Sequence, residues 1–471
     1  MSTAAAQPAI VGRRSSAAYA TGHPTLMRPT QSLYARQRGR PVPEGATTHR
    51  AMRLVAMVLA TLPQLLSAQL PVSIPREHPA VRTALAALQR DNGWTLDQQV
   101  SICEIPAPPF KEGLRAAEMR RRFEALGLAN VRLDSIGNVI AERRGTGDGP
   151  TVVIAGHLDT VFPEGTDVRV TRDGTRLTAP GIGDDCRGLA TILAVARAMQ
   201  QASIQTPGTI LFVANVGEEG PGNLRGVRYL FRKPPQAIDF FISVDGTGLG
   251  LTTGAVGSHR YRVQFEGPGG HSYGAFGMAN PIHALGRAIA RIADFQVPTS
   301  PRTTFSVGIV SGGTSVNTIS PLGAMEVDMR SESPIELDRV DASFKAALQA
   351  AVREENARWP KARGDTVSLQ LIDMGVRPAA PKNDTSYLAR TALAAGKALG
   401  FSAPTSASSS DANYPMSLGI AAITIDGGGM GRGAHSIAES YDDGAEGYKG
   451  PQWALLLVAA LAGLGRARYT P

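Results

Sequence analysis

Five short segments that end in acids or histidines constrain this chain more than any other feature of its sequence. They are GHLDT at 156–160, GDD at 183–185, GEEG at 217–220, VDG at 244–246 and GAHS at 433–436. The first, third and fourth directly follow the apolar runs TVVIA, TILFVAN and DFFISV, which are typical of buried strands, and the adjacent glycines indicate turns. Because an open α/β sheet binds ligands at the carboxyl ends of its strands, we expect these segments to meet at one site.

Predicted strands and helices alternate from residue 82 to residue 256. RTALAALQRD and LRAAEMRRRFEALG have helical spacing, and NVRLDSIGNVIAERR predicts a hairpin that turns at Gly137. LATILAVARAMQQA predicts an amphipathic helix between two of the apolar strands. This alternation predicts an α/β fold with a largely parallel sheet and helices on both faces.

The pattern changes near residue 257. Between HRYRVQFEG and TVSLQLIDMG the predicted order is β-α-β-β-α-β, the split pattern of a ferredoxin-like α+β module of about 115 residues. After Pro378 a helix, the strand GIAAITIDGGG and a final helix resume the α/β rhythm. We therefore predict one metal-binding catalytic domain from residues 80–256 and 375–471, interrupted by an inserted module at 257–374. The two halves of this domain must meet to complete the site, because the segment at 433–436 lies in the second half.

The first 68 residues differ from the rest in composition. Residues 1–53 hold eight arginines, no lysine and one acid, so they account for +7 of the net charge of +8. The remainder has no basic bias, and nucleic acid is not expected as a partner. Residues 1–51 lack apolar periodicity, which predicts either disorder or a start codon placed too far upstream.

A secretory signal pattern occupies residues 52–68. Met52-Arg53 is followed by the apolar stretch LVAMVLATLPQLL and then by Ser67-Ala68, and this stretch is too short for a transmembrane span. If translation starts at Met52, we expect an exported protein, periplasmic or secreted, that begins near Gln69. If 54–66 is an ordinary buried segment, the protein is cytoplasmic. In neither case is it integral to the membrane.

The two cysteines allow at most one disulfide and say little about the compartment. Cys186 lies in the segment GDDCRG, where a soft metal ligand is conceivable. A small residue on the first turn of a helix is the preferred interpretation.

His157 and Asp159 are two residues apart at a predicted strand end, so their side chains point to the same face. A carboxylate behind an imidazole fixes the tautomer and raises the basicity of a metal-binding histidine. A solvent-exposed strand end is the alternative for this pair alone, and the other four segments favour the metal site.

Asp184 and Asp185 precede a helix predicted to begin near Gly188. A carboxylate at this place can cap the helix, or it can bind metal. In the second interpretation Asp184 bridges two metals about 3.5–4 Å apart, with one oxygen on each.

Glu218 and Glu219 follow the strand TILFVAN. Adjacent carboxylates at a buried strand end repel each other, which raises one pKa unless cations share the site. The two carboxylates can lie side by side if Glu219 binds metal and Glu218 acts on the attacking water, first as general base and then as general acid. A solvated turn is the alternative.

The last two predicted ligands are Asp245 and His435. Asp245 closes the strand DFFISV, and a buried strand rarely ends in an acid without a partner, although a capping role is the alternative. His435 follows a glycine-rich stretch that lets the backbone approach a ligand closely, and the set needs a second imidazole. The predicted metal ligands are His157, Asp184, Glu219, Asp245 and His435.

GGHSYG spells G-x-S-x-G around Ser272, the pattern of a serine nucleophile elbow. Such an elbow joins a core strand directly to a helix, whereas the next predicted helix begins near Asn280. A metal-free serine hydrolase is therefore the weakest of the alternatives.

The order of these motifs resembles the co-catalytic dinuclear zinc peptidases (peptidase family M-twenty). That family includes tripeptidase T, carboxypeptidase G, aminoacylase and succinyl-diaminopimelate desuccinylase. The likeness rests on HLDT, GDDxxG, EEG, DG, GGHS, NTI at 317–319, DMR at 328–330 and AHS, and it spans residues 90–465.

The resemblance implies two zinc ions per subunit, although such sites also accept Mn²⁺ or Co²⁺. It implies that Asp184 bridges them, that His157 and Asp245 complete one site, and that Glu219 and His435 complete the other. Glu218 matches the general base of the family, and Asp159 matches the carboxylate behind the histidine.

The inserted module resembles the dimerisation or lid domain of the family. His271 matches a histidine that, in the dimers, reaches the active site of the partner subunit to stabilise the oxyanion. Asn317 and Arg330 match residues that hold the substrate, often by its carboxylate. Two features vary from the family pattern. Cys186-Arg187 stands where a lysine is common, and Asp245 resembles aminopeptidase and tripeptidase members rather than carboxypeptidase members, which tend to carry glutamate.

We therefore expect a zinc-dependent exopeptidase, closest to the tripeptidase-like branch, in which Glu218 activates a water between the metals. The expected partners are a short peptide substrate and a second copy of the chain, bound through the inserted module. An N-acyl-amino-acid deacylase or a carboxypeptidase, acting on N-acylated amino acids or peptides, is the alternative in the same chemistry. An inactive metal-binding dimer is disfavoured because Glu218 is retained.

Overall fold

The computed structural model describes residues 71–359 and 366–464. The predicted signal segment at 52–68 and the predicted disorder at 1–51 lie outside these residues. Within the described part of the chain, no helix is both long enough and apolar enough to cross a membrane.

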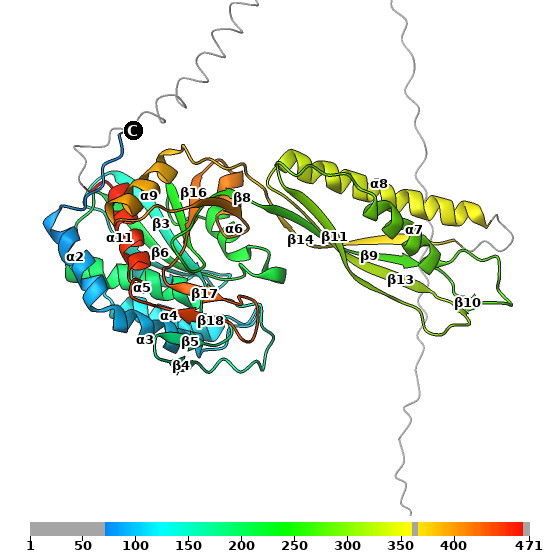
Figure 1. The fold of residues 1–471 in the computed structure, drawn as a ribbon, viewed down its shortest axis with the longest axis horizontal. Coiled ribbons are helices and arrows are strands. Elements are labelled where there is room, and N and C mark those ends of the chain that lie inside the picture. Colours follow the sequence, from blue (N-terminus) through cyan, green and yellow to red (C-terminus); the bar gives the residue numbers. More distant parts are fainter. Residues whose placement is uncertain (1–70, 360–365, 465–471) are drawn as a thin grey trace, which may run out of the picture. The chain divides into compact units, whose positions relative to one another are not determined.

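The predicted catalytic domain (Figure 1) is built on an eight-stranded sheet, and its strand order is β1-β2-β6-β3-β7-β16-β8-β15. The strands β6, β3, β7 and β16 run parallel, as do β8 and β15, whereas β1, β2 and the β16–β8 pair are antiparallel. Their bounds are β1 Ala129–Leu133, β2 Val139–Arg143, β3 Gly149–His157, β6 Gly208–Asn215, β7 Phe240–Val244, β8 Leu251–Ala255, β15 Thr405–Ser408 and β16 Ala421–Ile425. The predicted largely parallel sheet is confirmed, and so is the hairpin at Gly137, whose φ is 106°.

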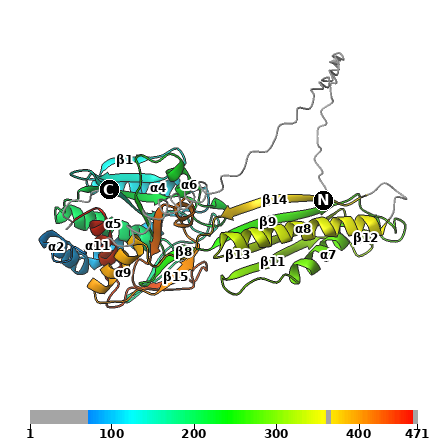
Figure 2. The same ribbon diagram turned by 90° about the horizontal axis from the view of Figure 1, so that it is seen from above.

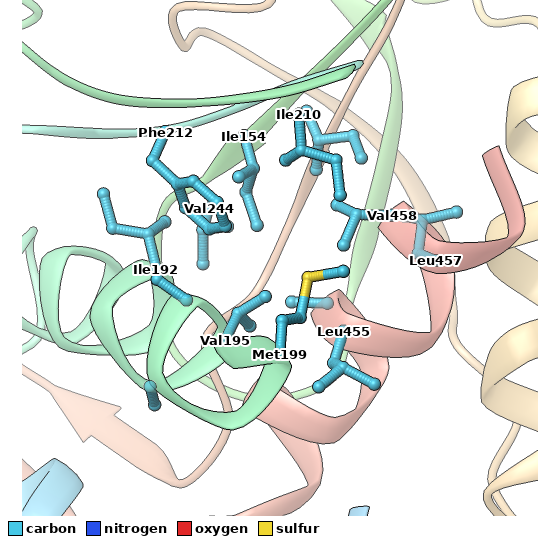
Figure 3. Close-up of a cluster of buried hydrophobic side chains, with 14 of the residues drawn as sticks. Ile154, Ile192, Val195, Met199, Ile210, Phe212, Val244, Leu455, Leu457 and Val458 are labelled. Carbon is cyan, nitrogen blue, oxygen red and sulfur yellow. The ribbon is translucent and has the colours of Figure 1, made fainter. Parts of the chain in front are cut away.

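Both faces of this sheet are buried, which explains why its central strands read as continuous apolar runs. Along β3, Val152 and Ile154 pack into one core and Val153 and Ala155 into another on the opposite face. The first core lies against α5, α11 and neighbouring helices, and Figure 3 shows Ile154 among its side chains. Each large apolar side chain buried there stabilises the fold by about 1.5–3 kcal/mol relative to exposure.

The helices of this domain are α2 (Pro79–Arg90), α3 (Asn92–Cys103), α4 (Gly113–Ala125), α5 (Cys186–Gln201), α6 (Arg225–Arg232), α9 (Tyr387–Ala398), α10 (Asn413–Ser417) and α11 (Lys449–Leu461), with a 3-10 turn η1 at Gly220–Gly222. Leu224, Val227 and Leu230, in and just before α6, pack on the second face of the sheet. Cys186 opens α5, is buried and, like Cys103, is a free thiol, as its interpretation as a small helix residue predicts.

The inserted module contains a four-stranded antiparallel sheet with the order β11-β13-β9-β14. Its elements follow the predicted β-α-β-β-α-β sequence, and α7 and α8 share one core with the sheet (Figures 1 and 2). The bounds are β9 Gly257–Glu266, α7 Pro281–Ala293, β11 Thr303–Gly312, β13 Leu322–Ser331, α8 Pro334–Arg358 and β14 Ser368–Arg377, with a short ladder of β10 (Gly270–His271) and β12 (Thr318–Ile319).

A small sheet that the sequence does not predict joins the two halves of the catalytic domain. Its order is β17-β18-β5-β4, with bounds β4 Thr171–Asp173, β5 Arg176–Thr178, β17 Met430–Arg432 and β18 Ser440–Asp442. The pairing of Thr178 with Ser440 places the loop that follows β5, which carries Asp184, beside the loop that carries His435. Strands of only three residues are too short to show a periodicity, so this connection is absent from the sequence pattern.

Candidate active site

The carboxyl ends of the parallel strands carry four of the predicted site residues, which are His157, Glu218, Glu219 and Asp245. His157 ends β3 and lies in register with Asn215, the last residue of β6, from which the chain continues to Glu218 and Glu219. Asp245 directly follows β7. Parallel strands bring their carboxyl ends to one edge of the sheet, so these segments converge there as the sequence predicts.

The carboxylate of Asp184 lies between two imidazoles. Its Oδ1 is 3.0 Å from Nε2 of His157, and its Oδ2 is 3.1 Å from Nε2 of His435. Oε1 of Glu219 is 3.0 Å from the same Nε2 of His435. Possible ligand atoms of His157, Asp184 and Glu219 all lie within 4.8 Å of one another, so these three residues form a group that can hold a metal ion.

Asp184 and Asp185 divide the two roles that suit an acid before a helix. The Asp185 carboxylate accepts the backbone N–H of Gly188 at 3.0 Å, which caps α5, and that of His157 at 2.9 Å. Asp184 instead faces the histidines. Capping is therefore the role of Asp185, and it leaves Asp184 available at the site.

Asp159 ties the His157 segment to the Glu218–Glu219 turn. Its two carboxylate oxygens accept the backbone N–H groups of Glu218 at 3.0 Å and Glu219 at 2.8 Å. Nδ1 of His157 lies 3.0 Å from the main-chain oxygen of Asp159 and 3.7 Å from its carboxylate. The nearest acceptor behind the imidazole is thus the carbonyl of Asp159, while its side chain orients the neighbouring turn.

Glu439 and Arg187 hold the loops of the two halves together. The buried Glu439 carboxylate accepts the backbone N–H groups of Gly181 at 3.0 Å, Gly183 at 2.8 Å and Asp184 at 3.0 Å. Arg187, fully buried, donates to the carbonyls of Gly427 and Gly447, both at 2.7 Å. Arg187 therefore has structural contacts in this chain.

The site concentrates buried negative charge. Burial, and then the neighbouring Asp184 carboxylate, raise the pKa of Asp245 to about 7. Carboxylates that repel each other in this way are stabilised by divalent cations. A set of two imidazoles and three carboxylates suits Zn²⁺, Mn²⁺ or Co²⁺, so the residues present fit a pair of such metals.

Glu218 is paired with Arg377, which the sequence did not single out. Nη1 of Arg377 donates to Oε1 of Glu218 at 2.8 Å and to Oγ of Ser409 at 3.0 Å, and Nη2 donates to the Glu218 carbonyl. Burial raises the pKa of Glu218, the Arg377 charge opposes this shift, and Glu219 adds to it. Arg377 is the last residue of β14 and directly precedes Pro378, where the chain leaves the inserted module. This position at the boundary of the module is the feature of the sequence that could have indicated a role at the site.

A cavity of about 690 Å³ opens beside the site, and among the residues of its wall that the structure describes only Val161 has an apolar side chain. Arg330 lines it, as does Arg260, which no motif in the sequence indicates. Both arginines use Nε to bind the carboxylate of Asp328, Arg260 at 3.0 Å and Arg330 at 2.7 Å. The wall also contains Asp184, Glu218, Glu219, Gly220, Asp245, Thr252, Arg377, Ser406, Ser408, Ser409, Thr424, Asp426 and His435.

His271 and Asn317 are not part of this cavity wall. They lie together at the β10–β12 ladder, where the Ser272 backbone N–H donates to the Asn317 carbonyl at 2.9 Å, and both side chains are exposed. Ser272 follows a two-residue strand, and helix α7 starts only at Pro281. The strand-to-helix elbow that a serine nucleophile requires is therefore not formed.

Known proteins resemble this chain in sequence and in fold. A succinyl-diaminopimelate desuccinylase of Nitrosospira multiformis is 27% identical over 300 residues, which cover 57% of this chain and 78% of that protein. A tripeptidase of Staphylococcus aureus has a similar fold, with a TM-score of 0.65, 21% identity and coverage of 78% of this chain and 98% of that one. A dinuclear metal-binding peptidase of Bacillus subtilis has a TM-score of 0.57 at 19% identity, covering 80% and 98%.

Residues 153–450, more than half of the chain, match the sequence profile of peptidase family M20/M25/M40. The matched range contains the predicted metal ligands, Glu218 and the whole inserted module. The chain therefore belongs to peptidase family M20/M25/M40 and is a metal-dependent hydrolase of that family.

Proposed function

We propose that this protein removes residues from the end of short peptides as a two-metal exopeptidase of the tripeptidase or aminopeptidase type. The observation that carries the proposal is the position of Asp184, whose two oxygens each face the imidazole of a different histidine. A carboxylate that bridges two metals needs this divergence, because each oxygen serves a different ion.

The predicted ligands divide into two sets around Asp184. His157 and Asp245 would hold one ion and Glu219 and His435 the other. When bound, the two ions polarise the scissile carbonyl and make water a stronger acid. Zn²⁺, Mn²⁺ and Co²⁺ all suit this donor set.

The protein's own contribution to proton transfer is assigned to Glu218. Its carboxylate takes a proton from the attacking water and returns it to the departing amine, so that it serves first as base and then as acid. Arg377 holds Oε1 of this carboxylate, and the Asp159 carboxylate holds its backbone N–H. Arg330, in the cavity wall, is proposed to bind the substrate carboxylate.

An N-acyl-amino-acid deacylase is the second candidate, favoured by the identity with a desuccinylase. A panel of dipeptides, tripeptides and N-acylated amino acids, tested on protein loaded with each metal, separates the two. We expect free peptides to be the better substrates and a chelator to abolish turnover. Hydrolysis restricted to N-acylated amino acids supports the deacylase instead, and activity that survives chelation contradicts both candidates.

We further propose that two copies of the chain associate through the inserted module and that His271 acts in the site of the partner subunit. His271 and Asn317 are exposed and stand apart from the cavity of their own chain. Strand β11 is an edge of the four-stranded sheet and carries Ile309 and Val310, which are 54% and 56% exposed. An uncovered edge with apolar side chains favours pairing with another copy.

Mixing two inactive variants tests this arrangement. In a mixed dimer, the His271→Ala chain keeps Glu218, and the Glu218→Gln chain supplies the missing histidine, so one complete site forms. Random re-association should restore about one quarter of wild-type activity, since half of the dimers then carry one complete site. No recovery from demonstrably mixed dimers contradicts action across the interface, and a monomer in sedimentation contradicts the dimer.

A further inference from the structure

Among the described residues of the cavity wall, Asp426 is the one acid to which neither metal binding nor proton transfer has been assigned. It directly follows β16, whose last residue Ile425 is in register with Val244 of β7. Asp426 therefore occupies on β16 the position that Asp245 occupies on β7, at the same edge of the sheet. The two strands are neighbours in the sheet, so Asp426 follows β16 beside the predicted metal ligand Asp245, and both line the same cavity.

Three glycines make room for this carboxylate. A Cβ added to Gly248 or Gly250 would lie 2.9 Å from Oδ2 of Asp426, and one added to Gly246 would lie 3.3 Å from Oδ1. A side chain at Gly248 or Gly250 would therefore make the carboxylate shift from this position.

The Asp426 carboxylate has spare binding capacity. Oδ2 accepts the backbone N–H of Gly250 at 2.6 Å, and neither oxygen forms an ion pair or a further hydrogen bond with any residue that the structure describes. Burial, only partly offset by the Gly250 hydrogen bond, raises its pKa to about 6, as expected of an acid without a cationic partner. A partly buried carboxylate without a cationic partner is stabilised when it binds a cation.

We propose that Asp426 binds a primary ammonium group of the substrate, which in an unblocked peptide is the N-terminal α-ammonium. This inference rests on the proposed peptidase function and adds to it a preference for a free amine over an acyl group. The arginines Arg260 and Arg330 line the same cavity, so the wall offers a negative group to one end of a short peptide and positive groups to the other. Asp426 is thereby a specificity-determining residue that separates peptides from N-acylated amino acids.

The test compares substrates that differ only in the amine. Propionyl-dialanine is trialanine without its α-amine, and 6-aminohexanoyl-dialanine keeps a side-chain amine that hexanoyl-dialanine lacks. Metal-loaded wild type should show a kcat/KM about 10- to 100-fold higher for trialanine than for propionyl-dialanine, the usual worth of a charge-assisted hydrogen bond. Asp426→Asn keeps an acceptor for Gly250, and it should lower kcat/KM for trialanine by that factor and leave propionyl-dialanine unchanged.

Asp338→Asn is the matched control, because it removes one negative charge from an exposed position on α8. It should leave the ratio between the two substrates unchanged. If Asp426→Asn lowers kcat/KM for 6-aminohexanoyl-dialanine instead of trialanine, Asp426 binds a side-chain ammonium of the substrate. The proposed ammonium site then stands. Equal losses on trialanine and propionyl-dialanine in Asp426→Asn, or no preference in wild type, overturn the proposal.

Calorimetry on metal-loaded Glu218→Gln protein measures the binding of each substrate without turnover. Trialanine should bind more tightly than propionyl-dialanine, and adding Asp426→Asn should remove the difference. If this holds while wild type hydrolyses neither compound, the ammonium site stands and the peptidase function fails. If the amine makes no difference to binding, the ammonium site is wrong even where hydrolysis occurs.

Discussion

Replacing Glu218 by glutamine is expected to lower kcat by at least about 10²- to 10⁴-fold, the contribution of general acid–base catalysis. Glutamine keeps the shape of the side chain, and its amide oxygen can still accept the hydrogen bond from Arg377, but it cannot take a proton from water. The metal content should remain at two, because the adjacent Glu219, rather than Glu218, faces His435. Single-turnover kinetics together with metal analysis of the purified variant measure both quantities.

Glu219→Gln is the matched control for this experiment, since it makes the same chemical change one residue away. It should weaken one metal, because a neutral amide replaces a carboxylate ligand. The assignments are reversed if Glu218→Gln loses metal and keeps activity while Glu219→Gln does the opposite. If neither variant changes kcat or metal content, the active site lies elsewhere. A melting curve close to that of wild type excludes misfolding, which matters because Glu218 is buried beside an arginine.

Replacing Asp184 by alanine is expected to remove both metals and all turnover. Each of its oxygens lies near the Nε2 atom of a different histidine, so neither metal position retains its complete set of ligands without this carboxylate. Asp245→Asn should affect only one metal, because Asp245 belongs to one of the two proposed sets. Asp338→Ala, at an exposed position on α8, controls for the loss of charge.

Equilibrium dialysis against a metal buffer, followed by elemental analysis, gives the occupancy of each variant. Asp184→Ala protein that holds two metals would show that this carboxylate is not the bridge. We expect the variant to fold, because Glu439 binds the backbone N–H of Asp184 and this contact does not depend on the replaced side chain. Circular dichroism checks this.

The sequence predicts those parts of the site that depend on local patterns. TVVIA and DFFISV are apolar because β3 and β7 are covered on both faces. His157 at the end of β3 and Asp245 directly after β7 therefore lie at the edge where ligands bind. The β-α-β-β-α-β order of the inserted module follows from the same periodicities. For these elements the signal lies within a few residues of the feature that it predicts.

The parts that could not be predicted depend on partners that are distant in the chain. Arg377 reaches Glu218 across 159 positions, and Glu439 reaches Gly181 across 258. The small sheet that brings the Asp184 and His435 loops together has strands of only three residues. Asp426 looks like a turn residue until the register of β16 with β7 places it beside Asp245. A single sequence contains no measure of such proximity.

The metal content of wild type, His157→Ala and His435→Ala protein shows whether the two histidines hold separate metals. Each histidine faces a different oxygen of Asp184, so we expect two metals per chain in wild type, one in each variant and no turnover in either variant. Elemental analysis after dialysis against a metal buffer gives these ratios. Two metals and full activity in both variants would contradict the dinuclear site.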